Sequence, residues 1–222
     1  KIEARYFVSL MRSQVAKNMI STFFFQMNAL QGGASRPQDI ARSSVKKLGI
    51  LGAGMMGAGI ALLAAKKGMQ VVLKDISVEN AEKGKAYVQK ALEKDKRQDQ
   101  AQVPGILALI NATADAKDLA GCDFVIEAVF EDRKIKAAVT AETEAQTDAT
   151  SIFASNTSSL PISELAEASS RKANFIGMHF FSPAEKMPLV EIICGKETSP
   201  EALAKTFDLA QQLGKTPIVV ND

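Results

Sequence analysis

Three polar side chains could perform acid–base chemistry on a substrate hydroxyl. His179 is the only histidine of the chain, and a histidine can take a proton from an alcohol and return it near neutral pH. Glu191 lies in the apolar run LVEII, where an acid needs a partner, and a His–Glu pair would fix the tautomer and stabilise the imidazolium. Ser158 could hydrogen-bond a substrate oxygen. A structural role for His179 is the alternative, and these residues alone leave it open.

A glycine pattern indicates which elements position this chemistry. The apolar run Leu48 to Leu51 precedes the glycines of a G-x-G-x-x-G pattern, Gly52, Gly54 and Gly57. Small residues then recur on one face of a predicted helix, and a second apolar run, Val71 to Leu73, follows. The glycines are expected to allow a tight turn, close approach to a pyrophosphate and close helix–strand packing. This order predicts a dinucleotide-binding βαβ unit.

An acidic residue at the end of the second run indicates which dinucleotide is bound. Asp75 lies where a carboxylate accepts hydrogen bonds from the ribose hydroxyls of the adenosine half, and it would repel the 2′-phosphate of NADP. The adjacent Lys74 is expected to point to the other face of the strand. The predicted cofactor is therefore NAD. A βαβ unit without a ligand and a site for another adenosine-containing ligand are the alternatives.

The composition is that of a soluble globular protein with a substantial core. Apolar residues make up 46% and charged residues 23% of the 222 residues, which are ordinary proportions. The net charge of +2 gives no reason to propose a nucleic acid or an anionic membrane as a partner. Cys122 and Cys194 are too few for a disulfide framework and lack metal-ligand spacing, so we expect a reducing compartment and assign no metal.

The first 30 residues are predicted to form one or two amphipathic helices, because apolar residues recur every three to four positions. A signal peptide is the alternative, since Met19 to Phe25 is apolar, but charged residues interrupt the region and the apolar run is too short to span a bilayer. Residues 31–45 begin with the turn-rich QGGASRPQ and are assigned to a linker, with a domain boundary near residue 40. The chain starts without methionine and stops after an apolar run, so we expect a piece of a longer protein.

The remainder of the chain alternates between strand-like and helix-like segments. Strands are expected near residues 110–113, 123–129, 151–155, 174–181, 189–194 and 216–220. This alternation predicts an α/β fold, with a Rossmann-type, doubly wound, mainly parallel sheet preceded by a helical segment from an adjoining domain. Ligands of such sheets bind at the carboxyl ends of the strands, and Ser158 and His179 fall at such ends.

The segment from Val78 to Gln102 is rich in lysine, glutamate and glutamine, and it is predicted to form a long solvated helix or a pair of helices. Four of its cations could meet a phosphorylated carrier such as coenzyme A: Lys90, Lys94, Lys96 and Arg97. An ordinary charged helix face is the favoured alternative.

Six motifs carry a family resemblance. In chain order they are GILGAGMMGAGIA, VIEAVFED, IFASNTSSLPIS, IGMHFFSP, EKMPLVEII and GKTPIVV. They resemble the NAD-binding domain of L-3-hydroxyacyl-CoA dehydrogenases, especially the multifunctional fatty-acid oxidation α subunits, and residues 46–222 are assigned to that domain. Residues 1–30 resemble the helical tail of the enoyl-CoA hydratase/isomerase domain that precedes the dehydrogenase in those subunits.

The resemblance implies a role for each matching residue. His179 is the general base, Glu191 is its partner, and Ser158 contacts both substrate and cofactor. The other positions that match the cofactor site are Gly52, Gly54, Met56, Gly57, Asp75, Val129, Phe130, Glu131 and Lys136. Many relatives have Asn where this chain has Ser182 in HFFSP. We also place Ser182 in the cofactor site, where a single hydroxyl replaces an amide.

The implied reaction is the NAD-dependent, reversible oxidation of L-3-hydroxyacyl-CoA to 3-oxoacyl-CoA in fatty-acid β-oxidation. The implied partners are these acyl-CoA substrates and, in the longer protein, a thiolase β subunit. The longer protein is also expected to be an enoyl-CoA hydratase. Another β-hydroxyacid dehydrogenase and a non-catalytic NAD-binding protein on the same fold are the alternatives.

Two further expectations follow from the resemblance. The helical C-terminal domain of the family closes over the substrate and contributes an Asn, so residues 1–222 alone are expected to bind NAD(H) yet be nearly inactive. The protein is expected in the cytoplasm, or in mitochondria if a preceding segment carries a transit peptide.

Overall fold

The chain divides into two compact units, Lys1–Arg36 and Pro37–Asp222. The computed structural model describes the backbone of residues 1–222 and every side chain except that of Gln31. The end of the predicted linker is tied to the second unit. The Ser43 N–H donates to Asp208 (2.9 Å) and the Val45 N–H donates to Gln212 (3.0 Å), both in helix α9 (Pro200–Gln212). The two units are described separately.

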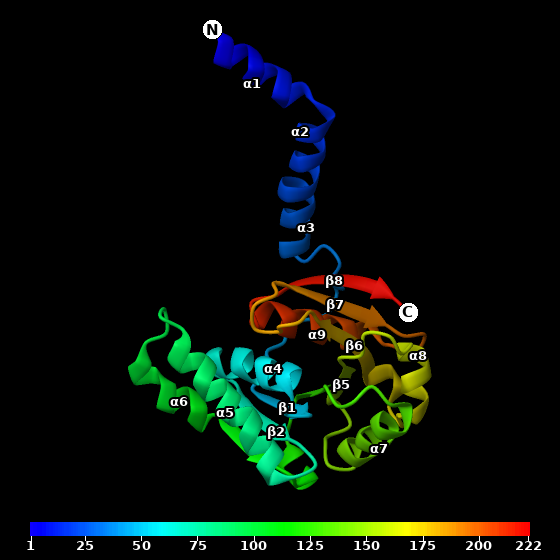
Figure 1. Cartoon of the computed structure of the whole chain (residues 1–222). Coiled ribbons are helices and arrows are strands. Elements are labelled where there is room, and N and C mark those ends of the chain that lie inside the picture. The colour runs from blue at the N-terminus through cyan, green and yellow to red at the C-terminus, as the bar shows by residue number, and fades with distance from the viewer. The chain divides into compact units, whose positions relative to one another are not determined.

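The first unit is helical, as the spacing of its apolar residues predicts. It contains α1 (Ile2–Arg12), α2 (Gln14–Met19), the π-helical stretch η1 (Ile20–Gln26) and α3 (Met27–Gln31), drawn in blue in Figure 1. The break after α1 lies at Ser13, whose backbone is extended and whose hydroxyl accepts a hydrogen bond from the Ala16 N–H. This is an N-cap, so Ser13 ends one helix and starts the next.

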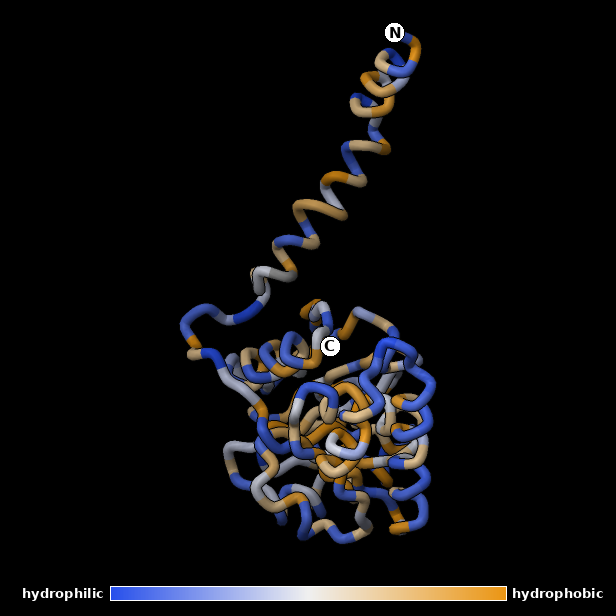
Figure 2. Tube along the Cα trace, turned by 90° about the vertical axis from the view of Figure 1, so that its left-hand side faces the viewer, coloured by the Kyte–Doolittle hydropathy of each residue, from blue (hydrophilic) through white to orange (hydrophobic). Residues whose placement is uncertain are grey.

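The apolar side chains of this unit are largely exposed. Phe23, Phe24 and Phe25 are 70%, 59% and 63% exposed, and Figure 2 shows hydrophobic residues interspersed with polar ones along these helices. Among the residues that the structure describes, no helix combines the length and the apolar character needed to cross a membrane.

The second unit is built on one eight-stranded sheet with the strand order β3-β2-β1-β4-β5-β6-β7-β8. The strands are β1 (Lys47–Leu51), β2 (Gln70–Lys74), β3 (Ile110–Thr113), β4 (Phe124–Glu127), β5 (Ile152–Ser155), β6 (Phe175–Phe180), β7 (Leu189–Cys194) and β8 (Thr216–Asn221). The chain reverses its direction of travel across the sheet after β3, so that β1 has β2 on one side and β4 on the other. A Rossmann-type sheet is thereby confirmed, and β1 with β4 forms its topological switch point.

Every neighbouring pair of strands is parallel except β6 and β7. Parallel neighbours need a crossover, usually a helix, whereas antiparallel neighbours can be joined by a short loop. The loop between Phe180 and Leu189 contains no helix, so β7 returns beside β6 in the opposite direction. Helix α9 then carries the chain back, and β8 runs parallel to β7.

Helices cover both faces of the sheet (Figure 1). They are α4 (Met55–Lys66), α5 (Val78–Lys94), α6 (Val103–Ala108), α7 (Arg133–Glu144), α8 (Ile162–Leu165) and α9. Successive strand residues enter different cores because side chains alternate between the faces. Ile126 joins the core that contains α4, α5 and α9, whereas Val125 joins the core that contains α8. Both faces are therefore buried, as the continuous apolar runs of these strands predict.

Candidate active site

The glycine turn between β1 and α4 forms a cradle whose three glycines meet different requirements. Gly52 has φ +92°, a conformation that other residues rarely adopt. A Cβ on Gly57 would overlap the carbonyl oxygen of Gly52, so glycine is needed for α4 to approach the turn. A Cβ on Gly54 would meet nothing within 4 Å. The space above Gly54 is therefore open to a ligand, and the predicted roles of the glycines agree with this geometry.

The N-terminus of α4 adjoins this open space. Gly54 is the N-cap and offers no side chain to the first N–H groups of the helix. Those groups carry partial positive charge and suit a phosphate. Met56 lies half-buried in the first turn. The cradle thus fits the pyrophosphate of a dinucleotide.

Asp75, directly after β2, braces the cradle. Its carboxylate accepts hydrogen bonds from the N–H of Ala53 (2.7 Å) and from its own neighbour Ile76 (2.7 Å). A carboxylate has about four acceptor sites, so capacity remains for ribose hydroxyls. The Lys74 side chain turns away to Glu142 of α7 (3.0 Å), as the alternation along β2 predicts. Asp75 therefore has a structural contact that the sequence did not indicate, beside its predicted role.

His179 and Glu191 form the predicted pair. They are direct partners in the antiparallel register of β6 and β7, and His179 Nδ1 lies 2.7 Å from Glu191 Oε2. With Nδ1 engaged, Nε2 is the ring atom left for a substrate. The side chains are 19% and 31% exposed, so the pair is accessible at its outer end. The contact makes His179 suited to be an oriented base.

The loop after β5 lies beside this pair because β5 and β6 are neighbours. Asn156 Oδ1 accepts a hydrogen bond from the Phe180 N–H (2.8 Å) and so fixes the strand next to His179. Ser158 is exposed on the same loop, and its N–H donates to Glu131 (3.2 Å). Asn156 lies in the motif IFASNTSSLPIS, but the sequence analysis assigned it no role.

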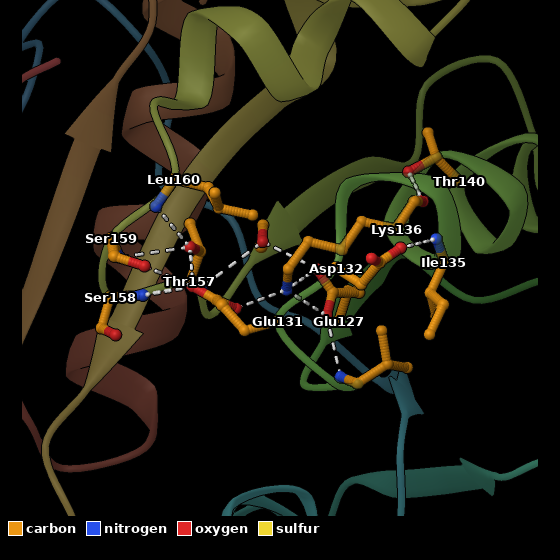
Figure 3. A network of polar contacts seen from close by, with 12 residues as sticks. Glu127, Glu131, Asp132, Ile135, Lys136, Thr140, Thr157, Ser158, Ser159 and Leu160 are labelled. Carbon is orange, nitrogen blue, oxygen red and sulfur yellow. Dashed lines mark hydrogen bonds and ion pairs between the residues drawn. The ribbon is translucent and has the colours of Figure 1, made fainter.

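A network of polar contacts joins two of the predicted cofactor-contact residues, Glu131 and Lys136, to Glu127 (Figure 3). Lys136 Nζ lies 2.8 and 2.9 Å from the two carboxylate oxygens of Glu127 and 3.1 Å from Glu131. Lys136 and Glu127 are 3% and 1% exposed. The ammonium of Lys136 is thus fully engaged by carboxylates, and its predicted contact with NAD requires one of these bonds to be shared or exchanged.

The Glu131 carboxylate is held by several donors. Thr157 and Ser159 donate through their hydroxyls, in addition to Ser158 and Lys136. Burial acts to raise the pKa of Glu131, but the hydrogen bonds from Thr157 and Lys136 outweigh it and hold the pKa below its usual value. Glu131 is therefore ionised at neutral pH.

Of the remaining predicted contact residues, one is bonded to this network and two are exposed. The Val129 N–H donates to Glu127 (2.8 Å), which fixes the turn after β4. Phe130 is 78% exposed, and Ser182 is exposed three residues beyond His179. Glu127 itself was not predicted. Its position within the apolar run DFVIEAV could have indicated that it has a partner. An acid embedded in an apolar run needs one, as was argued for Glu191.

A cationic groove of about 690 Å³ lies between α4, α5 and the loop that follows β6. Its charged lining residues are Lys66, Lys67, Lys90, Lys94, Asp95, Arg97, Glu185 and Lys186. The Tyr87 hydroxyl donates to Glu185 (3.0 Å) and so joins α5 to the loop that begins near His179. Three of the four predicted cations line this groove, and Lys96 lies outside it.

The cations of the groove are only partly neutralised. The backbone N–H of Arg97, and after it the Lys66 ammonium, hold the pKa of Asp95 below its usual value. Asp95 therefore offsets part of the charge of Lys66 and Arg97. The other lysines of the groove leave an excess of positive charge, which suits a phosphorylated ligand.

Comparisons with known proteins agree on one family. The model of the family "3-hydroxyacyl-CoA dehydrogenase, NAD binding domain" matches residues 47–222. The structure of (S)-3-hydroxybutyryl-CoA dehydrogenase PaaH1 from Ralstonia eutropha is 41% identical over 81% of this chain, with a TM-score of 0.78. This match covers 64% of the Ralstonia chain, so the present chain spans less than two thirds of that relative.

Two further structures extend the comparison. The 3-hydroxybutyryl-CoA dehydrogenase from Escherichia coli K12 is 31% identical over 81% of this chain and 39% of its own, with a TM-score of 0.77. The dehydrogenase part of multifunctional enzyme 1 from C. elegans is 28% identical, with a TM-score of 0.75. It covers 89% of this chain and 48% of its own.

Proposed function

The chain belongs to the family of 3-hydroxyacyl-CoA dehydrogenase NAD-binding domains, and we propose that it binds NAD and performs the acid–base step in the NAD-dependent oxidation of 3-hydroxyacyl-CoA. The observation that carries the proposal is the His179–Glu191 contact of 2.7 Å at the end of β6. It lies on the same sheet as a glycine cradle shaped for a dinucleotide. A binding protein without catalysis has no need of an oriented base, so this pair favours an enzyme over the non-catalytic alternative.

The residues of the cradle fit NAD. The open space at Gly54 and the N-terminus of α4 would hold the pyrophosphate, and Asp75 would accept the ribose hydroxyls of the adenosine half. Because β1 lies between β2 and β4, residues 129–131 and Ser158 lie on the side of β1 opposite Asp75, where they would hold the nicotinamide half. When bound, NAD supplies the acceptor for the hydride that leaves the substrate.

The side chains of the site then have distinct tasks. His179 takes the hydroxyl proton of the 3-hydroxyacyl substrate through Nε2 while the hydrogen on C3 leaves with its electron pair. Glu191 accepts the Nδ1–H bond, which fixes the tautomer and stabilises the imidazolium that forms. Ser158 holds the substrate oxygen. In the reverse direction His179 returns the proton, so the same pair serves both directions.

Substitution of Asp75 tests the choice of cofactor. The unmodified protein is expected to bind NADH clearly more tightly than NADPH. Asp75→Asn removes the negative charge but keeps an acceptor for the Ala53 N–H, so we expect NADPH affinity to rise by about 10-fold relative to NADH. Asp75→Ala also loses the brace and should weaken NADH binding while reducing the preference. Calorimetric titration measures both affinities, and equal affinities in the unmodified protein contradict the assignment.

The cationic groove supports coenzyme A as the carrier of the substrate. Its lysines suit the phosphates of coenzyme A, and the Tyr87–Glu185 bond links it to the loop next to His179. We propose that the phosphorylated half of the substrate lies in this groove while the acyl end reaches His179. An ordinary charged helix face remains the alternative, and the following experiment separates the two.

Replacement of Lys90 and Lys94 by glutamine is expected to raise KM for acetoacetyl-CoA by about 10-fold, since each lost contact with a phosphate weakens binding by about 0.5–1 kcal/mol. The maximal rate should change little. Lys83→Gln on the same helix is the matched control, because Lys83 is exposed and paired with Glu79. Acetoacetyl-pantetheine, which lacks the nucleotide, should show no difference between the variants. An equal rise in KM for both substrates contradicts coenzyme A binding in the groove.

We propose further that the chain comes from a multifunctional fatty-acid oxidation α subunit. The chain is similar to the dehydrogenase part of a multifunctional enzyme, which supports a multifunctional origin, and the family resemblance assigns residues 1–30 to the tail of a preceding hydratase domain. A thiolase β subunit is then the proposed partner, and the cytoplasm, or alternatively the mitochondrion, the proposed location. Hydration of crotonyl-CoA by the protein at its natural length tests the assignment, and its absence contradicts it.

The relatives also motivate a proposal about residues 1–222 alone. The chain spans 64% of the Ralstonia enzyme, and His179 and Glu191 are accessible at their outer ends. We propose that this length binds NAD(H) but turns over slowly, since oxyanion donors act most strongly where water is excluded.

A further inference from the structure

Glu127, Lys136 and Glu131 form a charged triad at the carboxyl ends of β4 and β5. Lys136 is bound to both Glu127 oxygens and to Glu131. The Glu127 carboxylate also accepts hydrogen bonds from the Val129 N–H (2.8 Å) and the Ser155 hydroxyl (2.7 Å). The triad is therefore held in one arrangement by two strands, a turn and a helix, and Figure 3 shows its side chains converging.

The charged triad carries an uncompensated negative charge. Two carboxylates share a single ammonium, which leaves a net charge of −1. Two of the other charges nearby in sequence have partners of their own. Asp132 accepts bonds from the N–H groups of Lys134 and Ile135 at the positive end of α7, and Arg133 is paired with Glu164. Glu127 and Lys136 are almost completely buried and Glu131 is 35% exposed, so water screens this charge only in part.

The placement of the triad follows from the strand order. Asp75 marks the adenosine side of β1, and β4 and β5 lie on the other side, between β1 and the strand that carries His179. The nicotinamide must reach from the cradle toward His179, since hydride leaves the carbon whose hydroxyl His179 deprotonates. The triad, at the ends of β4 and β5, would therefore lie close to a bound nicotinamide ring.

We propose that the charged triad stabilises the positively charged nicotinamide of NAD⁺ relative to the neutral ring of NADH, and so sets the ratio of the two affinities. The inference rests on the proposed NAD site. The two cofactor forms differ by one positive charge on the ring, while their adenosine and phosphate contacts are the same. A fixed negative charge close to the ring therefore acts on one form and hardly on the other.

Glu131→Gln is the main test, because Glu131 is 35% exposed and its amide variant keeps one carbonyl oxygen as the acceptor for Thr157 and Ser159. Neutralising this carboxylate is expected to raise the ratio Kd(NAD⁺)/Kd(NADH) by about 5- to 30-fold, from the interaction of two charges several ångströms apart in a medium of intermediate dielectric. Both dissociation constants are measured by calorimetric titration. Glu127→Gln should shift the ratio in the same direction. If Glu127→Gln fails to fold, the result for Glu131→Gln alone decides the test.

Two control variants separate charge from structure. Glu131→Asp keeps the charge and should keep the ratio, even where a shorter side chain weakens both affinities. Glu167→Gln removes a carboxylate from an exposed surface pair with Lys172 and should leave both affinities unchanged. A purely structural role of Glu131 predicts equal losses of NAD⁺ and NADH affinity, with an unchanged ratio.

The outcomes distinguish this inference from the function on which it rests. Failure of the unmodified protein to bind either cofactor form overturns the proposed function. If the unmodified protein binds both forms and Glu131→Gln leaves the ratio unchanged, the proposed function stands and the role of the charged triad is overturned. A shift of the ratio in Glu131→Gln but not in Glu131→Asp supports it.

Discussion

Replacement of His179 by alanine is expected to lower turnover by at least about 100-fold, the contribution typical of a general base. The imidazole Nδ1 lies 2.7 Å from Glu191 Oε2. No other histidine can replace it as the base, since His179 is the only histidine of the chain. NADH affinity should barely change, because His179 is assigned to the substrate and not to the adenosine half of the cofactor. Steady-state oxidation of NADH with acetoacetyl-CoA measures turnover, and calorimetry measures affinity.

A second substitution tests whether the loss of turnover is due to the loss of proton transfer by His179. His179→Gln keeps a polar side chain that can hydrogen-bond Glu191 but cannot exchange a proton near neutral pH, so it should be as slow as His179→Ala. Thermal unfolding of both variants reports whether the pair of strands β6 and β7 is intact. Substantial activity in either folded variant shows that His179 has a structural role instead.

The second large effect is expected for Gly57→Ala. Alanine in a helix interior normally stabilises relative to glycine by about 1 kcal/mol, but here the Cβ overlaps the Gly52 carbonyl oxygen. The N-terminus of α4 must move away from the turn, at a cost of about 1–3 kcal/mol, as for other overpacked sites. Displacement of the first N–H groups should weaken NADH binding by about 100-fold, since charge-assisted hydrogen bonds to the phosphates are lost.

Gly54→Ala is the matched control, because a Cβ at that position meets nothing within 4 Å. It should leave the free energy of unfolding within about 1 kcal/mol of the unmodified protein, yet weaken NADH binding, since the methyl group occupies the space open to the pyrophosphate. Chemical denaturation and calorimetry separate the two properties. Unchanged NADH affinity in Gly54→Ala places the cofactor elsewhere.

Much of the fold was predictable because its signals are local. Short buried strands appear as continuous apolar runs, and the glycines at 52, 54 and 57 mark the turn, which requires glycine at positions 52 and 57. The pairing of β6 with β7 was not predictable in the same way. The loop from Phe181 to Pro188 has no helical pattern, but a sequence does not state which strand will lie beside which, and the antiparallel register that places His179 opposite Glu191 is a non-local property.

In the candidate site, too, some residues were identified from local sequence patterns, whereas contacts between distant segments were not. His179 and Asp75 were identified by their types and by their positions at strand ends, and Glu191 was identified as an acid within an apolar run. Glu127 was missed, because its partner Lys136 is contributed by the following helix, and only the folded arrangement shows that the ammonium is shared with Glu131. The brace from Asp75 to the Ala53 N–H is likewise a contact between segments that a motif does not reveal.

The central claim, an NAD-dependent 3-hydroxyacyl-CoA dehydrogenase site built around His179 and Glu191, is tested most directly by one measurement. Oxidation of NADH is followed by absorbance with acetoacetyl-CoA as substrate, using the protein at its natural length beside its His179→Ala variant. We predict turnover that depends on acetoacetyl-CoA, prefers NADH over NADPH and falls by at least about 100-fold in the variant. The absence of turnover in the unmodified protein, with NADH demonstrably bound, would contradict the claim.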